Sequence, residues 1–149
     1  MSTIRITKSF TFETGHALYG YDGLCKNVHG HSYKLDVTVI GSPISDSNNV
    51  KYGMVIDFKD LKTIVKGEIV DLFDHATVFN QNTPHVELAN TLAANGHKVL
   101  LVDYQPTSEE MVVDFSAKIQ AKLPKNIQLH HLRLQETATS YAEWYASDQ

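Results

Sequence analysis

The sequence predicts an α+β fold in which helices cover one face of an antiparallel sheet. Several stretches alternate apolar and polar residues with the period of half-buried strands, and others repeat apolar residues at helical spacing. The 149 residues are enough for a real core, so we expect one domain over residues 1–149. The expected strands cover residues 4–16, 31–40, 98–104, 127–136 and 140–145, and the expected helices cover residues 58–72, 84–94 and 107–123.

The composition is ordinary for a soluble protein, with 42% hydrophobic and 20% charged residues. The chain has no run of about 18 apolar residues and its start lacks the apolar core of a signal peptide, so we expect no membrane partner and a cytoplasmic location. The single cysteine, Cys25, agrees with a reducing compartment and is free to react. A net charge of -4 without a dense Lys/Arg tract argues against a nucleic-acid partner.

The first expected strand places a histidine at the end of its apolar face. From Ile4 to Phe12 the even-numbered residues are apolar except Lys8, and the same parity continues to His16. The odd-numbered residues of this strand are mainly polar and would face solvent. His16 therefore lies where the buried face of the strand ends.

A His-Gly-His motif leads into the second expected strand. Side chains two residues apart in an extended chain project from one face, so His29 and His31 point the same way. Gly30 between them permits close approach of another backbone. If the two strands pair antiparallel across the loop 18–28, the end of the first meets the start of the second and brings His16 to this pair.

Three imidazoles around one ion, with a fourth position open, are typical of catalytic zinc, whereas structural sites usually close with four ligands and use paired cysteines. Cys25 is near enough in sequence to share the site without coordinating. The alternative is ordinary, since any one of the eight histidines is more often a surface or hydrogen-bonded residue than a ligand. The His-x-His pair and the complementary position of His16 favour the metal.

The helix expected over residues 58–72 has apolar residues at helical spacing and closes at an Asp-His pair. Two interpretations of that pair stay open. His75 is a cation near the C-terminal end of the helix dipole, or Asp74 and His75 form an acid–base relay in which the carboxylate sets the charge state of the imidazole. The polar connection 45–49 is expected to be mobile.

Residues 81–97 are harder to assign. A short helix ended by Asn95-Gly96 fits the pattern, and a buried strand follows it. Thr107 and Glu110 then form a capping box at the start of the next helix. The polar residues at this helix start therefore have a structural explanation before a functional one.

The strand over residues 127–136 ends in a carboxylate on its apolar face. Leu132 and Leu134 share that face with Glu136. A carboxylate there needs a partner, which a cation or a ligand with paired N–H groups would supply. A small open sheet of this kind also leaves exposed edges, which assembly with copies of itself would cover.

A set of motifs runs in order over nearly the whole chain: His16, Cys25, His29-Gly30-His31, residues 53–58, Asp74-His75, residues 106–109 and Glu136-Thr137. In combination they resemble the 6-pyruvoyl-tetrahydropterin synthase family, which includes the bacterial 6-carboxytetrahydropterin synthases of queuosine biosynthesis. The resemblance implies the tunnelling fold, in which sheets of several subunits close into an oligomeric barrel with active sites at subunit interfaces. It therefore implies a homo-oligomer, either a trimer or a dimer of trimers.

The resemblance implies a metal centre and a base. His16, His29 and His31 would hold Zn²⁺, which would bind side-chain hydroxyls of 7,8-dihydroneopterin triphosphate as a Lewis acid and template. Cys25 would be the general base, as a thiolate favoured by the nearby positive charge.

The remaining site residues implied by the resemblance bind the substrate or relay protons. Asp74 and His75 would complete the proton relay. Glu136 would anchor the pterin, because one carboxylate accepts two parallel N–H bonds. The helix-start residues that would line the same pocket are Thr107, Ser108 and Glu109.

The implied reaction removes triphosphate from the substrate and breaks its side chain, which yields 6-carboxy-5,6,7,8-tetrahydropterin and acetaldehyde. A close alternative stops at 6-pyruvoyl-tetrahydropterin with the same residues. A non-catalytic pterin or zinc binder and a structural zinc protein are alternatives from other classes. In a structural zinc protein, chelation would unfold the chain, whereas a catalytic site built on an existing sheet should lose activity first.

The sequence departs from the family pattern in two places, and it lacks an evident basic cluster for the triphosphate. Glu110 stands where the family commonly has Asn, and residues 81–96 look longer than in compact members, with no role assigned. No basic cluster for the triphosphate is evident, and Lys26 and Lys51 are the residues suggested for it.

Overall fold

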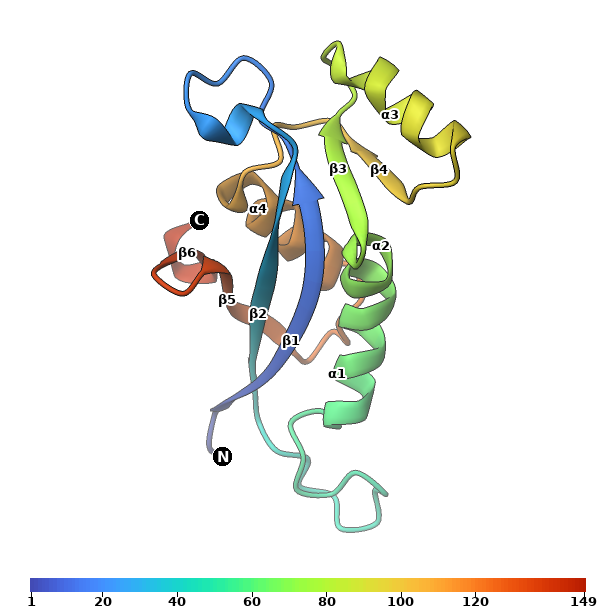
Figure 1. The fold of residues 1–149 in the computed structure, drawn as a ribbon. Helices are drawn as coiled ribbons and strands as arrows, with labels where there is room; N and C mark the ends of the chain where they lie inside the picture. The colour runs from blue at the N-terminus through green and yellow to red at the C-terminus, as the bar shows by residue number, and fades with distance from the viewer.

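The computed structural model describes residues 1–149 and contains one six-stranded sheet with strand order β4-β3-β1-β2-β5-β6 (Figure 1). The strands are β1 (Ile4–His16), β2 (His29–Gly41), β3 (Ala76–Asn80), β4 (Val99–Val102), β5 (Gln128–Thr137) and β6 (Ser140–Tyr145). The helices are α1 (Phe58–Val65), a π-helical turn (Lys66–Val70), α2 (Asp71–Phe73), α3 (His85–Ala94) and α4 (Ser108–Gln120), with 3₁₀ turns at Leu24–Lys26 and Ala146–Asp148. No helix has the length and apolar character that a membrane crossing requires.

The antiparallel sheet expected from the sequence is present as β1, β2, β5 and β6. A strand that the sequence analysis did not predict, β3, pairs parallel with the end of β1 and with β4, so the complete sheet is mixed. Only residues 14–16 of β1 meet β3, and β3 is five residues long. A strand this short gives too few residues for its period to be recognised.

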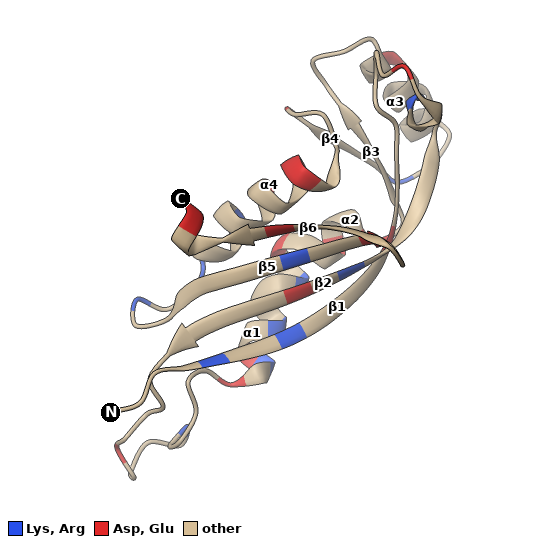
Figure 2. Ribbon diagram, turned by 90° about the vertical axis from the view of Figure 1, so that its left-hand side faces the viewer, with Lys and Arg blue, Asp and Glu red and all other residues tan.

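The two main helices pack on one face of the sheet, as expected. The even-numbered side chains of β1 join the odd-numbered side chains of β2 there, including Phe12 and Leu35, which are almost fully buried. Leu61 of α1 and Phe115 of α4 belong to the same core. The opposite face of β1, β2, β5 and β6 carries charged residues of both signs (Figure 2), as a solvated sheet face does.

The third helix, α3, lies on the opposite face of the sheet from α1 and α4. Phe79 of β3 and Ala89 of α3 form a separate small core with Ala17, whereas Val78 faces the main core. Residues 81–97 therefore belong to a β3–α3–β4 unit. The buried strand expected over 98–104 is a shorter edge strand, and Leu101 is 37% exposed because no further strand or helix covers it.

The helix ends follow the sequence closely. The helix predicted over 58–72 continues to Phe73, with the π-helical turn around Gly67. α3 ends at Ala94, directly before Asn95 and Gly96. At the start of α4, the Thr107 hydroxyl accepts from the Glu110 backbone N–H at 3.2 Å. The Thr107 N–H donates to the Gln105 carbonyl instead of the Glu110 side chain, so only one half of the predicted capping box forms.

Replacing Phe115 should test whether α4 is held mainly by this core. Its ring lies 4.9 Å from that of Phe73 and 6.1 Å from that of Phe12. Phe115→Ala should lower the free energy of unfolding by about 3–5 kcal/mol, because the cavity it leaves is lined by other rings. Val113→Ala, at a position of the same helix that is 52% exposed, should change it by under about 1 kcal/mol. Urea titration at one protein concentration measures both, and equal losses would contradict the packing described.

Candidate active site

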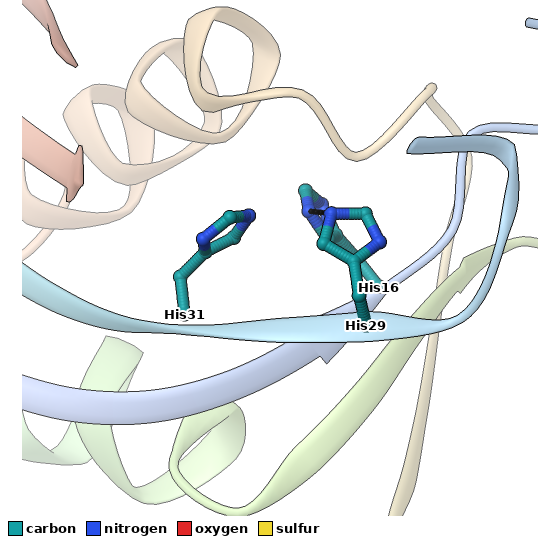
Figure 3. A group of neighbouring side chains, drawn as sticks. All are labelled: His16, His29 and His31. Carbon is teal, nitrogen blue, oxygen red and sulfur yellow. Dashed lines mark hydrogen bonds between the residues drawn. The ribbon is translucent and has the colours of Figure 1, made fainter. Parts of the chain in front are cut away.

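The strand register brings three imidazoles together at the end of the β1–β2 hairpin where the connecting loop joins the strands. His16 lies directly opposite His29, and Thr14 lies opposite His31. Their ring centroids are 4.5–5.2 Å apart, and one nitrogen from each ring lies within 4.8 Å of the others (Figure 3). The convergence of His16, His29 and His31 expected from the sequence is therefore present.

Backbone carbonyls set the direction of two of these rings. Nδ1 of His16 donates to the Pro106 carbonyl at 2.6 Å, and Nδ1 of His29 donates to the Asn27 carbonyl at 2.7 Å. A carbonyl only accepts, so both rings carry their proton on Nδ1 and have a lone pair on Nε2. The two Nε2 atoms are 3.1 Å apart, the pair joined by the dashed line in Figure 3. Two lone pairs at this separation repel each other, and a cation between them removes the repulsion.

The third ring completes a donor set suited to a metal ion. Nε2 of His31 lies 3.2 Å from Oε1 of Glu136, but the two are not aligned for a hydrogen bond and this buried nitrogen has no partner. Tetrahedral coordination at bond lengths of about 2.05 Å separates nitrogen ligands by about 3.3 Å. The 3.1 Å between His16 and His29 is close to that value, and one nitrogen of His31 lies within 4.8 Å of both, so the three rings are placed to hold one ion.

Burial keeps two of the ligands neutral. Desolvation lowers the pKa of His16 below its usual 6.5, against the opposing effect of the Pro106 carbonyl. Desolvation also lowers the pKa of His31, against the attraction of the Glu136 carboxylate. Neutral imidazole is the form that binds a metal, so both rings stay ready to coordinate to a lower pH than a free histidine.

A cavity of about 330 Å³ opens beside His16. Five sequence-predicted residues line it together with His16: Cys25, Thr107, Ser108, Glu109 and Glu136. Cys25 is a free, partly buried thiol on the loop between β1 and β2, and its carbonyl accepts from the Leu18 N–H at 3.0 Å. The loop therefore holds the thiol at the same cavity as the metal ligands.

The carboxylate of Glu136 is held at the start of α4. Its Oε2 accepts from the hydroxyl of Ser108, which is only 5% exposed, while Oε1 faces His31. The carboxylate thus has a fixed orientation between the helix start and the imidazoles. Thr107 combines its predicted capping role with a place on the cavity wall.

Asp74 and His75 lie elsewhere in the chain's own structure. His75 lines a separate cavity of about 320 Å³, whose wall includes Glu13, Gly15 and Ser32, and Asp74 directly precedes His75 in the chain. Glu13, Gly15 and Ser32 alternate with the imidazole-bearing positions of β1 and β2 and so face the other side of the sheet. Thr14 and His31 also line this cavity, but none of its residues lines the cavity of Cys25. A single chain therefore does not bring the pair to Cys25.

The pair itself is well defined. Oδ2 of Asp74 lies 3.0 Å from Nδ1 of His75, whose side chain is 76% exposed and whose backbone has the left-handed φ of 61°. The Glu13 N–H donates to Oδ1 of Asp74 at 2.9 Å, and mainly this bond lowers the pKa of the carboxyl. Asp74 is thus ionised and fixed beside an imidazole directed away from its own chain.

Comparison with known proteins identifies the family. The model of the family described as 6-pyruvoyl tetrahydropterin synthase matches residues 5–147. The chain belongs to this family. A 6-carboxy-5,6,7,8-tetrahydropterin synthase from Haemophilus influenzae is 38% identical over 141 residues, which cover 94% of this chain and 97% of that protein. The enzyme of the same name from Aquifex aeolicus is 30% identical, with 93% and 96% covered.

Solved structures agree with the fold of the 6-pyruvoyl tetrahydropterin synthase family. The Caenorhabditis elegans 6-pyruvoyl tetrahydropterin synthase superposes with a TM-score of 0.69 at 22% identity, covering 98% of this chain and 97% of that one. An uncharacterized protein from Wolinella succinogenes superposes with a TM-score of 0.77 at 19% identity, covering 98% and 99%. The subunit fold expected from the resemblance is confirmed, and the assembly of subunits into a barrel stays a prediction.

Some contributors to this family member's site were not predicted. The carbonyls of Asn27 and Pro106 orient the metal ligands, and Tyr21 and Gln105 line the cavity. Backbone carbonyls leave no signature in a sequence, because every residue has one. Tyr21 lies in a segment that composition marks only as a loop.

Removing one ligand should remove the metal without unfolding the chain. His29→Ala should lower zinc affinity by more than about 100-fold, since changes outside the ligand shell alone cost 10–100-fold. His97→Ala is the matched control, because His97 is exposed and outside the cluster. Chelator competition and metal content after dialysis measure the affinity, and circular dichroism measures the fold. Retention of zinc by the His29 variant would contradict the site.

The lowered pKa values of His16 and His31 make a pH prediction for the metal-free protein. As the pH falls through 6.5, these histidines become protonated in the unfolded chain but stay neutral in the native one. The free energy of unfolding should therefore decrease between pH 7.5 and 5.5. The lowered pKa of Asp74 acts only below its usual 3.8 and lies outside this window. Urea titrations at the two pH values measure the decrease.

The control for this prediction is His31→Gln, which removes one of the three rings with a lowered pKa, the third being His130. It should show a smaller decrease over the same interval than the unaltered chain. A free energy of unfolding that stays level or rises on acidification in the unaltered chain would contradict the burial of neutral imidazoles.

Proposed function

We propose that this chain is a zinc-dependent 6-carboxy-5,6,7,8-tetrahydropterin synthase that acts on 7,8-dihydroneopterin triphosphate and releases triphosphate and acetaldehyde, in the 7-deazapurine branch that leads to queuosine. The observation that carries the proposal is a cluster of three imidazoles able to hold a metal, one of which, His16, lines the same cavity as a free thiol and a fixed carboxylate. The name of the 38% identical Haemophilus influenzae relative favours this product over 6-pyruvoyl-tetrahydropterin.

The donor set fits zinc. Three neutral nitrogen ligands without a thiolate or carboxylate in the cluster match the usual ligands of catalytic Zn²⁺, which keeps one position for water or substrate. When bound, zinc would supply Lewis acidity toward the hydroxyls of the substrate side chain. His16, His29 and His31 would hold it, and the carbonyls of Pro106 and Asn27 would keep two of those rings in the coordinating tautomer.

Glu136 would bind the pterin ring. An ionised carboxylate accepts two parallel N–H bonds, and the amino-pyrimidinone edge of a pterin offers such a pair. Ser108 would keep one carboxylate oxygen in place, and the buried position of this hydroxyl would limit competition from water. Thr107 and Glu109 would complete the wall around the ring.

Cys25 would act as the general base. Its thiol lines the same cavity as His16 and Glu136, so a ring anchored at Glu136 would present its side chain between thiol and imidazoles. Cys25 would remove a proton from a carbon of that side chain. A binding protein needs no such base, which favours an enzyme over a non-catalytic pterin binder.

Asp74 and His75 would complete the site of a neighbouring subunit in a homo-oligomer, a trimer or a dimer of trimers. Within one chain His75 lines a different cavity from Cys25, and its imidazole is largely exposed. The Asp74 carboxylate, 3.0 Å from Nδ1, would hold the ring in place, and His75 would pass protons to and from the substrate. This arrangement would make each active site dependent on two chains.

Removing the thiol should separate catalysis from metal binding. Cys25→Ala should lower turnover of 7,8-dihydroneopterin triphosphate by at least about 100-fold, the contribution expected of a general base, while the zinc content stays unchanged. Mass spectrometry of the products decides between 6-carboxy and 6-pyruvoyl tetrahydropterin. Full turnover by the Cys25 variant would exclude it as the base, and absence of turnover by the unaltered zinc-loaded chain would exclude the proposed function.

Mixing two inactive variants should test the shared site. Cys25→Ala and His75→Ala chains are each expected to be inactive alone, but refolding them together would create some sites with both residues intact. Activity should therefore reappear in the mixture at a fraction of the unaltered level. The control is each variant refolded with itself, and a mixture no more active than these controls would place both residues in a site formed by one chain.

A further inference from the structure

A second cavity adjoins the one that contains Cys25. It has a volume of about 460 Å³ and lies between the loop that joins β1 to β2 and the start of α3. Its lining residues are Leu18, Tyr19, Gly20, Tyr21, Lys26, Asn27 and His85. Leu18 and Tyr21 line both cavities, so these two side chains form the boundary between them. Figure 1 shows the loop and α3 at the same end of the molecule.

The charge of this second cavity is suited to an anion. Lys26 is the only lysine or arginine that lines either of the two adjoining cavities or the one beside His75, and no carboxylate lines the second cavity. Lys26 makes no ion pair, whereas Lys51 is paired with Asp57. Lys51 also belongs to the loop after β2, at the opposite end of the β1–β2 hairpin from the three imidazoles. Of the two lysines suggested from the sequence, only Lys26 is free and near the site.

His85 adds a hydrogen-bond donor to the same cavity. Its ring is packed edge-on against Tyr19 at 5.1 Å and against Phe79 at 5.3 Å between centroids. Its Nδ1 is buried without a partner. A buried N–H without an acceptor is costly, so the neutral ring carries its proton on Nε2. Nε2 makes no hydrogen bond within the chain, which leaves a donor for a ligand in the cavity.

We infer that this second cavity binds the triphosphate of the substrate, with Lys26 and His85 as its contacts. The inference rests on the proposed function, because the triphosphate is attached at the end of the side chain farthest from the pterin ring. With the ring at Glu136 and the side chain at Cys25, the next residue in the chain, Lys26, faces the cavity beyond Tyr21. Residues 81–97 then have a role, since α3 supplies His85.

Binding of inorganic triphosphate to the zinc-loaded protein tests the inference without turnover. Lys26→Gln should weaken binding roughly tenfold or more, since a contact to a charged group is worth at least that factor. His85→Phe keeps the packing against Tyr19 and Phe79 and removes the nitrogens, so it should weaken binding several-fold. Titration calorimetry measures the affinities.

The matched control is Lys125→Gln, an exposed lysine without an ion pair in the turn after α4, at the end of that helix remote from Ser108. It should bind triphosphate like the unaltered chain. Equal affinity of the Lys26 and Lys125 variants would overturn the inference. An equal loss of affinity of the Lys26 variant for unphosphorylated 7,8-dihydroneopterin would also overturn it, because Lys26 would then act on the loop or the pterin.

Turnover distinguishes this inference from the proposed function. If the unaltered chain turns over 7,8-dihydroneopterin triphosphate, Lys26→Gln should raise KM at least about tenfold and change kcat less. If the unaltered chain shows no turnover, the proposed function fails, and the triphosphate affinities of the same variants still decide whether the cavity is an anion site. Normal turnover with an unchanged KM in both variants would overturn the cavity assignment alone.

Discussion

The register between β1 and β2 is the constraint on which the candidate site depends. Thirteen consecutive cross-strand pairs join the two strands, and the last of them sets His16 opposite His29. A slip of one residue would turn every side chain of one strand to the other face of the sheet, which would separate the imidazoles and expose Phe12 or Leu35. The apolar core that forms along the same strands therefore also fixes the geometry of the metal ligands.

The rest of the site is added at the loop end of this hairpin, by the connecting loop and by segments remote in sequence. The connecting loop supplies Cys25, the residues before α4 supply the carbonyl of Pro106, and the end of β5 supplies Glu136. Each of these segments is held by main-chain or buried side-chain hydrogen bonds, such as that from Ser108 to Glu136. The candidate site residues from β1, β2, β5 and α4 are thus held on regular elements, and Cys25 is on the connecting loop, the part most free to adjust.

Sequence reasoning predicted the parts of the fold that have long periodic patterns. β1 and β2 alternate over thirteen residues each, so both their faces and the meeting of His16 with His29 could be inferred before any coordinates. β3 could not be inferred, because its five residues pair in parallel with only three residues of β1. The exposure of Leu101 depends on β4 being at the sheet edge, a property of topology that a local pattern does not contain.

For the site, residue types and spacing identified the three histidines and the carboxylate, but not which face of the sheet each group would occupy. Asp74 and His75 follow a helix in the sequence, and only the pairing of β3 with β1 shows that His75 lines a different cavity from Cys25. The two acceptors that aim His16 and His29 are peptide carbonyls, which no single substitution can delete. These carbonyls can be removed from the site only by moving the chain segments that carry them. Changes of side chain at positions 27 and 106 that leave the backbone in place therefore keep the orientation of the two rings.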